Sequence, residues 1–188
     1  MLTVSEPVKG LRVIAGEHRG ARLEAPRGDR TRPTSDFVRE AAFNLVGPVE
    51  DADVLDLYAG SGAMGIEALS RGARSATFVE KDRDACRTIQ QNLQKLRLTG
   101  ARVRCEDALR ALAADTGSGR KYDLVLVDPP YEMYPDLETR LAHYLPSVLA
   151  DDGLLVVETA QRDEPDLPLA KRTSRKYGSK RLTLFEHA

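Results

Sequence analysis

The chain has 188 residues, of which 41% are hydrophobic and 30% are charged, so it is long enough to bury a single core beneath a well-solvated surface. It contains no apolar run of membrane-spanning length, and its first ten residues lack the basic start and apolar stretch of a secretory signal. We therefore expect a cytoplasmic protein without a membrane partner. Its two cysteines, Cys86 and Cys105, lack metal-ligand spacing and are too few for a disulfide framework, so we expect no metal and two ordinary thiols.

The formal net charge of −1 conceals a segregation of charge along the chain. The segment Lys9–Arg39 carries eight Lys and Arg against four Asp and Glu, and Lys171–Arg181 carries six basic residues and no acidic one. Together these segments carry +10, which leaves −11 for the rest of the chain. Basic ends around an acidic middle favour a surface for a polyanion, although two solvated faces without a partner would have the same composition.

The N-terminal part of the chain has the pattern of a small extension. Segments Leu11–Ala15 and Ala21–Ala25 are predicted strands joined by a glycine-containing turn, which together indicate a β-hairpin. An arginine-rich connector follows. Thr34 or Ser35 then caps a predicted helix that ends at the Gly-Pro pair after Val46.

From position 51 the pattern changes to alternating strands and helices. The predicted strands are Val54–Tyr58, Ala76–Glu80, Arg102–Cys105, Tyr122–Val127, Leu154–Glu158, Ser174–Tyr177 and Arg181–Phe185. The predicted helices are Ala63–Arg71, Arg83–Leu98, Ala108–Ala114 and Pro135–Leu149. Because no helix separates the last two strands, we expect an α/β fold with a mainly parallel sheet and one antiparallel strand at its end. The chain is accordingly divided into an extension over residues 1–50 and a main domain over residues 51–188.

A glycine-rich turn follows the first strand of the main domain. Its G-x-G-x-x-G pattern lets the backbone turn tightly and approach a ligand closely, although glycines used only for tight packing remain an alternative. Asp56 precedes the pattern, where a carboxylate would repel a pyrophosphate but suits a cofactor that carries an amino group and a sulfonium cation. The predicted cofactor-binding residues here are Asp56, Tyr58, Ala59, Gly60, Gly62 and Gly65.

Acidic residues also follow the second and third strands. Glu80, with Lys81 after it, is placed to accept hydrogen bonds from the hydroxyls of a ribose. Asp107, followed by Ala108, is placed to accept a hydrogen bond from the amino group of an adenine. The alternatives are an exposed acid at position 80 and a helix N-cap at Asp107, and the N-cap is compatible with the ligand role.

Asp128-Pro129-Pro130-Tyr131, after the fourth strand, is the most specific pattern in the chain. An exocyclic amine of a base is a poor nucleophile because its lone pair is delocalised into the ring. Asp128 and the carbonyl of Pro129 would each accept one N–H and favour a pyramidal nitrogen that attacks a methyl group in line. Pro130 adds stiffness, and Tyr131 offers a face for stacking of the base. We predict all four as catalytic residues, with a rigid turn as the alternative.

These residues carry a resemblance to a known family. The segment Val54–Gly72 closely resembles the first motif of the RsmD family, bacterial small-subunit rRNA guanine-N2 methyltransferases. The similarity runs from Leu11 to Phe185, and its most selective block is Arg32-Pro33-Thr34-Ser35-Asp36. The resemblance implies the class I S-adenosylmethionine-dependent methyltransferase fold, a doubly wound, seven-stranded, mostly parallel sheet with its last strand antiparallel, here with a small N-terminal β-hairpin extension.

The same resemblance implies a function and partners. It implies S-adenosyl-L-methionine as the methyl donor, the exocyclic N2 amine of a guanine in 16S rRNA as the target, and 16S rRNA or a small-subunit particle as the partner. We expect the chain to act as a monomer. Phe37 departs from the family, which often has a polar or basic residue there, and we interpret it as a local surface difference. The residues predicted to bind RNA are Arg12, Arg19, Arg22, Arg32 and Arg39.

Three other functions remain open from the sequence. A DNA adenine-N6 methyltransferase would use the same Asp-Pro-Pro-Tyr chemistry, but this chain has no room for a sizeable target-recognition segment. A nicotinamide-dependent oxidoreductase would explain the glycine-rich turn and leave Asp128–Tyr131 unexplained. An RNA-binding module without catalysis is the third alternative. The intact glycine-rich turn and the intact Asp-Pro-Pro-Tyr segment argue against it, because such a module would need neither.

Overall fold

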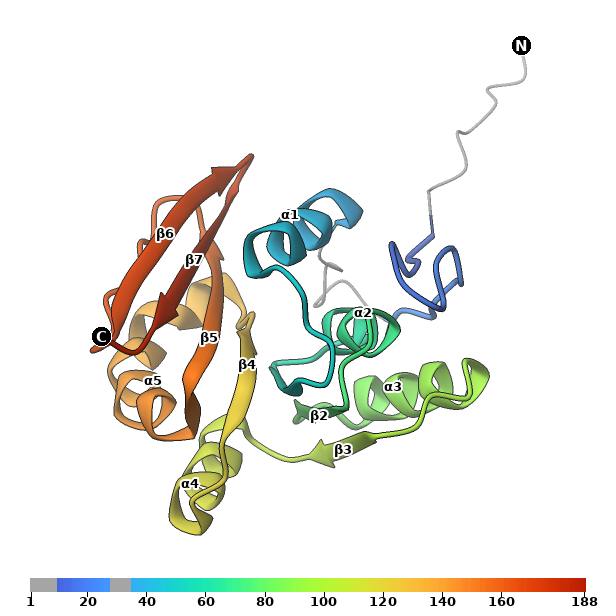
Figure 1. Cartoon of the computed structure of the whole chain (residues 1–188), viewed down its shortest axis with the longest axis horizontal. Coiled ribbons are helices and arrows are strands. Elements are labelled where there is room, and N and C mark those ends of the chain that lie inside the picture. The colour runs from blue at the N-terminus through green and yellow to red at the C-terminus, as the bar shows by residue number, and fades with distance from the viewer. Residues whose placement is uncertain (1–9, 28–34) are drawn as a thin grey trace.

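A computed structural model describes residues 10–27 and 35–188. Within these residues one sheet has the strand order β3-β2-β1-β4-β5-β7-β6 (Figure 1). Its strands are β1 (Asp53–Leu57), β2 (Ser75–Glu80), β3 (Ala101–Cys105), β4 (Tyr122–Val127), β5 (Leu149–Ala160), β6 (Ala170–Tyr177) and β7 (Lys180–Glu186). The helices are α1 (Asp36–Val46), α2 (Ala63–Ser70), α3 (Arg83–Lys95), α4 (Ala108–Ser118) and α5 (Tyr134–Val148), with a 3-10 turn η1 (Tyr131–Met133).

The sheet has the predicted topology. Neighbouring strands from β3 to β5 pair in parallel, whereas β7 runs antiparallel to both β5 and β6. The doubly wound, mostly parallel sheet of seven strands with its last strand antiparallel is thus confirmed. No helix in the described part of the chain is both long and apolar enough to cross a bilayer.

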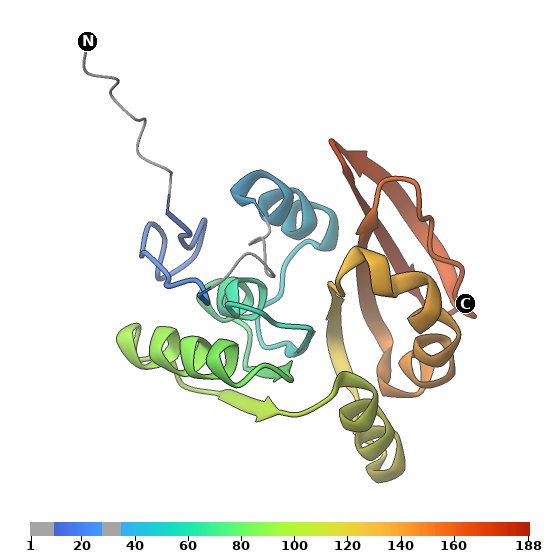
Figure 2. The ribbon, with the colours of Figure 1, turned by 180° about the vertical axis from the view of Figure 1, so that it is seen from behind.

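The two faces of the sheet are covered by different helices, because successive residues of a strand point to opposite faces. Val54 and Phe78 pack under α1, α2 and α3, whereas Leu55 and Val79 pack against α4 and α5. Figures 1 and 2 show the two groups of helices on opposite sides of the sheet. Burial on both faces explains why the central strands read as nearly continuous apolar runs.

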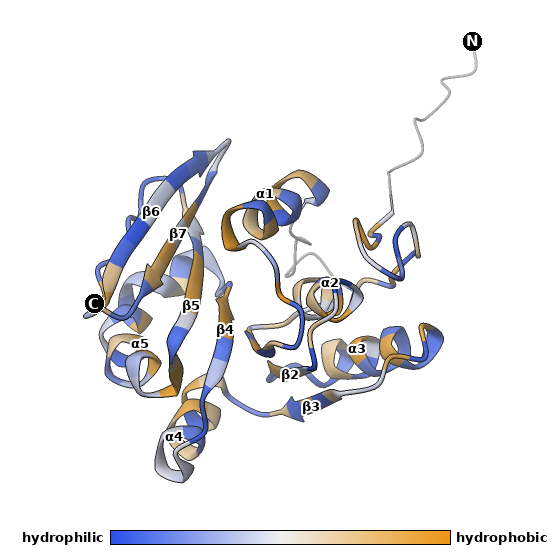
Figure 3. Cartoon of the chain, viewed as in Figure 1, coloured by the Kyte–Doolittle hydropathy of each residue, from blue (hydrophilic) through white to orange (hydrophobic). Residues whose placement is uncertain are grey.

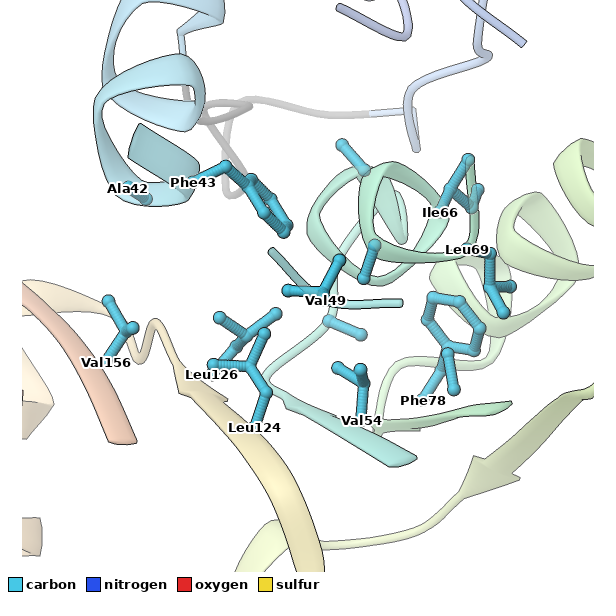
Figure 4. Close-up of a cluster of buried hydrophobic side chains, with 14 of the residues drawn as sticks. Ala42, Phe43, Val49, Val54, Ile66, Leu69, Phe78, Leu124, Leu126 and Val156 are labelled. Atoms are coloured by element: carbon cyan, nitrogen blue, oxygen red, sulfur yellow. The ribbon is translucent and has the colours of Figure 1, made fainter. Parts of the chain in front are cut away.

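The N-terminal extension shares the first of these cores. Figure 4 shows Phe43 of α1 among the buried side chains of β1, β2 and β4. Val13 and Leu23, from the segment before α1, belong to the same buried cluster. Ser35 is the N-cap of α1, as predicted, because its Oγ accepts a hydrogen bond from the N–H of Val38 at 3.3 Å.

The predicted hairpin strands are wrong as strands. Between Leu11–Ala15 and Ala21–Ala25 the structure has a single antiparallel bridge, which joins Arg12 to Arg22. The chain reverses direction there as expected, with the N–H of Val13 donating to the carbonyl of Ala21 at 2.9 Å. A regular ladder does not continue beyond this bridge.

The hairpin stops because its backbone is bonded to α2 instead. The N–H groups of Ile14 and Ala15 donate to the carboxylate of Glu67, at 2.9 and 3.0 Å. Glu67 is fully buried, accepts from Arg71 Nε at 2.9 Å and lies 3.6 Å from Arg39 Nε. A buried carboxylate needs such partners to offset its lost hydration. Glu67 therefore ties the extension to the main domain.

The cysteines are paired, contrary to our expectation. Cys86 of α3 and Cys105 of β3 form a disulfide, with their Cα atoms 6.0 Å apart. The expectation of two separate thiols was wrong because it rested on spacing along the chain. In the fold, the end of β3 lies beside the first turn of α3, and 6.0 Å is within the usual range for bridged cysteines.

Candidate active site

The candidate site lies at the carboxyl ends of the parallel strands. From β1 the chain moves outward through β2 to β3, and it then returns to place β4 on the other side of β1. The loops after β1 and β4 therefore leave the sheet next to each other, at the point where the strand order reverses. Doubly wound sheets bind their ligands at this point. Here the glycine-rich turn follows β1, and the Asp-Pro-Pro-Tyr segment follows β4.

The glycine-rich turn is built from left-handed backbone. Gly60 and Gly62 have φ values of 56° and 79°, which glycine adopts without steric cost. Tyr58 has a φ of 57°, a strained value for an aromatic residue and one that is common at functional sites. A Cβ on Gly62 would lie 3.2 Å from the side chain of Ile89, so a larger residue there would also require Ile89 to shift. The N–H of Gly62 donates to the carbonyl of Ala59 at 2.8 Å and closes the turn.

Asp56 lies beneath the turn and braces it. Its side chain is buried, and its Oδ2 accepts from the N–H of Gly65 at 2.9 Å. Burial raises the pKa of Asp56 to about 8, the hydrogen bond from Gly65 opposes this shift, and the charge of Glu80 adds to it. A Cβ on Gly65 would lie 2.3 Å from the ring of Phe78, so only glycine lets α2 approach β2 and reach Asp56.

Glu80 connects the end of β2 to the same turn. One carboxylate oxygen accepts from the N–H of Gly60 at 2.9 Å, and the other accepts from the N–H of Asp82 at 2.9 Å. Lys81, which lies between Glu80 and Asp82 in the sequence, is exposed. The structure thus brings the predicted cofactor residues of β1 and β2 together around one turn.

Asp107 caps α4, as the alternative interpretation expected. Its Oδ1 accepts from the N–H groups of Leu109 and Arg110, at 3.0 and 3.2 Å, and Ala108 is buried as the first residue of the helix. The pKa of Tyr58 is raised to about 12, mainly by burial and further by the charge of Asp107. The carboxylate of Asp107, after β3, is therefore near enough to Tyr58, which precedes the glycine-rich turn, to raise its pKa.

The Asp-Pro-Pro-Tyr segment is held in place by β5. Pro129 is buried, Asp128 is partly buried, and Pro130 leads into η1. The hydroxyl of Tyr131 donates to Glu158 Oε1 at 3.0 Å. The tyrosine ring that we predicted as a stacking face is thus fixed by a hydrogen bond at its far end.

Sequence reasoning missed two residues of this arrangement. Glu158 is 4% exposed, and its Oε1 also lies 2.9 Å from Lys180 Nζ. Burial and the charges of Glu158 and Asp128 raise the pKa of Tyr131 far above its usual range, so the phenol stays protonated and able to donate. The available signal was an acid at the end of an apolar strand, the pattern that identified Glu80.

Comparison with known proteins identifies the family. The family described as Conserved hypothetical protein 95 matches residues 11–186. The chain belongs to this family. The present chain is 41% identical over 150 residues to Ribosomal RNA small subunit methyltransferase D of Escherichia coli (strain K12). The match covers 79% of the present chain and 74% of that relative. The resemblance to the RsmD family is confirmed.

Solved structures confirm the class I methyltransferase fold. The structure of yhhF from Escherichia coli matches the present chain with a TM-score of 0.83 and 34% identity. The match covers 94% of the present chain and 98% of yhhF. SMU.776, whose structure is complexed with SAH, shares the fold at a TM-score of 0.66 and 15% identity, over 79% of this chain and 48% of that one.

The arginines that we predicted to bind RNA separate into three groups in the structure. Arg19 and Arg22 are exposed, and Arg12 is half-exposed with its Nε 2.8 Å from Asp36 Oδ2. Arg32 lies outside the described residues. The predicted RNA contact of Arg39 needs correction because its side chain is fully buried. Its guanidinium donates to the carbonyl of Arg12 and to Asp36, so Arg39 supports the extension from inside.

Proposed function

We propose that this chain is a 16S rRNA (guanine-N2)-methyltransferase that uses S-adenosylmethionine as methyl donor. The observation that carries this proposal is the placement of the glycine-rich turn and the Asp128–Tyr131 segment side by side at the reversal of the strand order. One segment suits a nucleoside-containing donor, and the other suits an exocyclic amine. The name of the Escherichia coli relative adds small-subunit ribosomal RNA as the substrate class.

The glycine-rich turn fits an adenosine-containing donor. A Cβ on Gly60 would meet open space, so the tip of the turn leaves room for a ligand. Glu80 has both oxygens near this tip and would hold the ribose hydroxyls, while Asp107 would accept from the adenine amino group. Asp56 would act from beneath, by fixing the turn. When bound, the donor would supply an activated methyl group, and SAH in SMU.776 is the demethylated form of that donor.

The Asp128 segment fits the amine to be methylated. In our mechanism Asp128 and the carbonyl of Pro129 accept the two N–H groups of the guanine N2 amine, which turns its lone pair out of the ring plane. Tyr131 stacks on the base, and its hydroxyl stays bonded to Glu158, so the stacking face is set before RNA binds. The target base has to leave its stack to reach this position, as in other enzymes that modify bases.

Mapping of the methylated nucleotide tests the proposal. The purified chain is incubated with labelled donor and either protein-free 16S rRNA or undermethylated small subunits, and the product is located by mass spectrometry. We expect a single N2-methylguanine in small-subunit rRNA. N6-methyladenine in a DNA control, or no transfer to either RNA substrate, would refute the proposal. Calorimetry with S-adenosylmethionine and NADH separates the methyltransferase from an oxidoreductase, and only the first ligand is expected to bind.

A further inference from the structure

Phe37 is an exposed aromatic residue that the proposed chemistry does not use. It lies in the first turn of α1 and is 66% exposed. Its ring contacts the ring of Tyr177 edge to face, with centroids 5.9 Å apart and an interplanar angle of 73°. Tyr177 ends β6, so this pair joins the N-terminal extension to the last two strands. A side chain that is both exposed and held by a second ring keeps a fixed face towards solvent.

The pair lies at the catalytic edge of the sheet. Tyr177 pairs with Lys180 at the start of β7, and β7 starts where β5 ends because the two strands are antiparallel. Lys180 in turn contacts Glu158, which holds Tyr131 of the catalytic segment. Figure 1 shows α1 beside the turn between β6 and β7, at the edge where β4 ends. A short chain of contacts therefore links Phe37 to Tyr131, which is proposed to stack on the target base.

Exposed basic side chains of β6 lie next to the pair. Of the six basic residues of Lys171–Arg181, Arg175 and Lys176, next to Tyr177, are exposed. The other four lie in ion pairs with Glu158, Glu164 or Glu186. Figure 3 shows β6 as a largely hydrophilic strand. Arg12 is half-exposed and forms an ion pair with Asp36, the neighbour of Phe37. Aromatic faces within a basic surface are the combination that binds unpaired nucleotides, through stacking and phosphate contacts.

We propose that Phe37, held by Tyr177, is a stacking platform for an unpaired RNA base that flanks the target guanine. This inference rests on the proposed function, since it assumes an RNA substrate at this edge. Phenylalanine offers no hydrogen bond, so the platform holds the flanking nucleotide without selecting its identity. Its role is to position the RNA after the target base has left its stack, which revises our interpretation of Phe37 as a neutral surface difference.

Substitutions at Phe37 test the platform without disturbing the core, because the side chain is exposed. Affinity is measured for a protein-free small-subunit rRNA fragment that contains the mapped target. Phe37→Ala and Phe37→Leu should bind about five- to a hundredfold more weakly, and Phe37→Tyr, which keeps the ring, should bind as wild type does. The salt dependence should stay unchanged because no charge is removed, and turnover at saturating RNA should also be unchanged. Asn44→Ala, an exposed change two turns further along α1, is the matched control.

Each other outcome has a distinct meaning. Wild-type affinity in the Leu and Ala variants would overturn the platform. Weakened binding to assembled small subunits alone, with protein-free RNA unaffected, would show that Phe37 contacts a ribosomal protein and would also overturn it. If the wild-type chain methylates neither RNA substrate, the proposed function fails, and that result is obtained without any Phe37 variant.

Discussion

At the scale of single residues, the site separates groups that touch ligands from groups that support them. In the proposed function Asp128 contacts the amine directly, whereas Asp56 is buried beneath the glycine-rich turn and accepts a hydrogen bond from the N–H of Gly65. Asp56 lies near the end of an apolar strand and Asp128 directly follows one, so their sequence contexts look alike. Their different burial predicts different responses to the same kind of substitution.

Asp128→Ala should abolish most of the turnover. It removes one preorganised acceptor of the amine, a loss that typically costs about a hundred- to a thousandfold in rate. Asp128→Asn keeps an acceptor oxygen without the full charge and should fall between wild type and Asp128→Ala. Single-turnover methylation at saturating donor and RNA measures the order. Donor affinity should not change, and an Ala variant as fast as wild type would mean that the segment is only a turn.

Asp56→Asn should flatten the pH dependence of stability. Because burial raises the pKa of Asp56 to about 8, the folded protein retains a proton that the unfolded chain releases above a pH of about 4. The stability that this group contributes is complete below the unfolded pKa and is lost as the pH rises towards 8. Asn still accepts from Gly65 but does not titrate. Melting temperatures between pH 5 and 8 should therefore decline less in the variant, and equal slopes would contradict the assignment.

At the scale of elements, the closing strands of the sheet support the Asp128–Tyr131 segment. Glu158 of β5 accepts from the hydroxyl of Tyr131 at 3.0 Å, and Lys180 of β7 lies 2.9 Å from the same carboxylate oxygen of Glu158. The antiparallel strand at the end of the sheet thus has a role in the site as well as in the fold. Loops that carry reacting groups gain precision when regular elements fix them.

Tyr131→Phe should lower turnover while donor affinity stays unchanged. The ring remains able to stack, but it loses its bond to Glu158, and misplacement of a base by about 1 Å typically costs up to a hundredfold. Glu158→Gln, which retains an acceptor for the hydroxyl, should have a smaller effect. Turnover and KM for RNA are compared in both variants. Equal activity of Tyr131→Phe and wild type would exclude a positioning role.

At the scale of the whole molecule, we propose that the two basic segments extend the site into a surface for RNA. The extension carries the exposed Arg19 and Arg22 and is fixed to the main domain through the buried Glu67. Asn92 of α3 strengthens this connection, since its side chain bonds both Glu24 of the extension and the carbonyl of Ser61 in the glycine-rich turn. Asn92 therefore links the segment proposed to bind RNA to the turn proposed to bind the donor.

Replacement of Arg19 and Arg22 by Gln should weaken RNA binding and reduce its salt dependence. Each lost phosphate contact lowers the slope of log affinity against log salt by about one. Donor binding, measured by calorimetry, should be unaffected because neither residue contacts the glycine-rich turn. Arg97→Gln, a change outside both basic segments, serves as the control. An unaltered slope in the double variant would remove the extension from the RNA surface.

The sequence by itself determined the order of elements and the places where chemistry occurs. Strand–helix alternation, glycine spacing and the caps Ser35 and Asp107 act over a few residues, so local pattern is sufficient to predict them. Acidic residues near the ends of apolar strands, Asp56, Glu80 and Asp128, identified the strand ends on which the proposed site is built. Parallel strands end at one edge, and this brought the motifs together without further information.

Only the tertiary structure decided which distant residues became partners. The burial of Arg39 against Glu67, the pairing of Cys86 with Cys105 and the contact of Phe37 with Tyr177 all join segments far apart in the chain. Such contacts depend on which elements neighbour each other and on their exact spacing. An arginine, a cysteine or a phenylalanine looks the same in sequence whether it meets solvent or a partner. Burial and proximity are properties of the packed fold, and they separate the residues that support this site from those placed to meet its substrate.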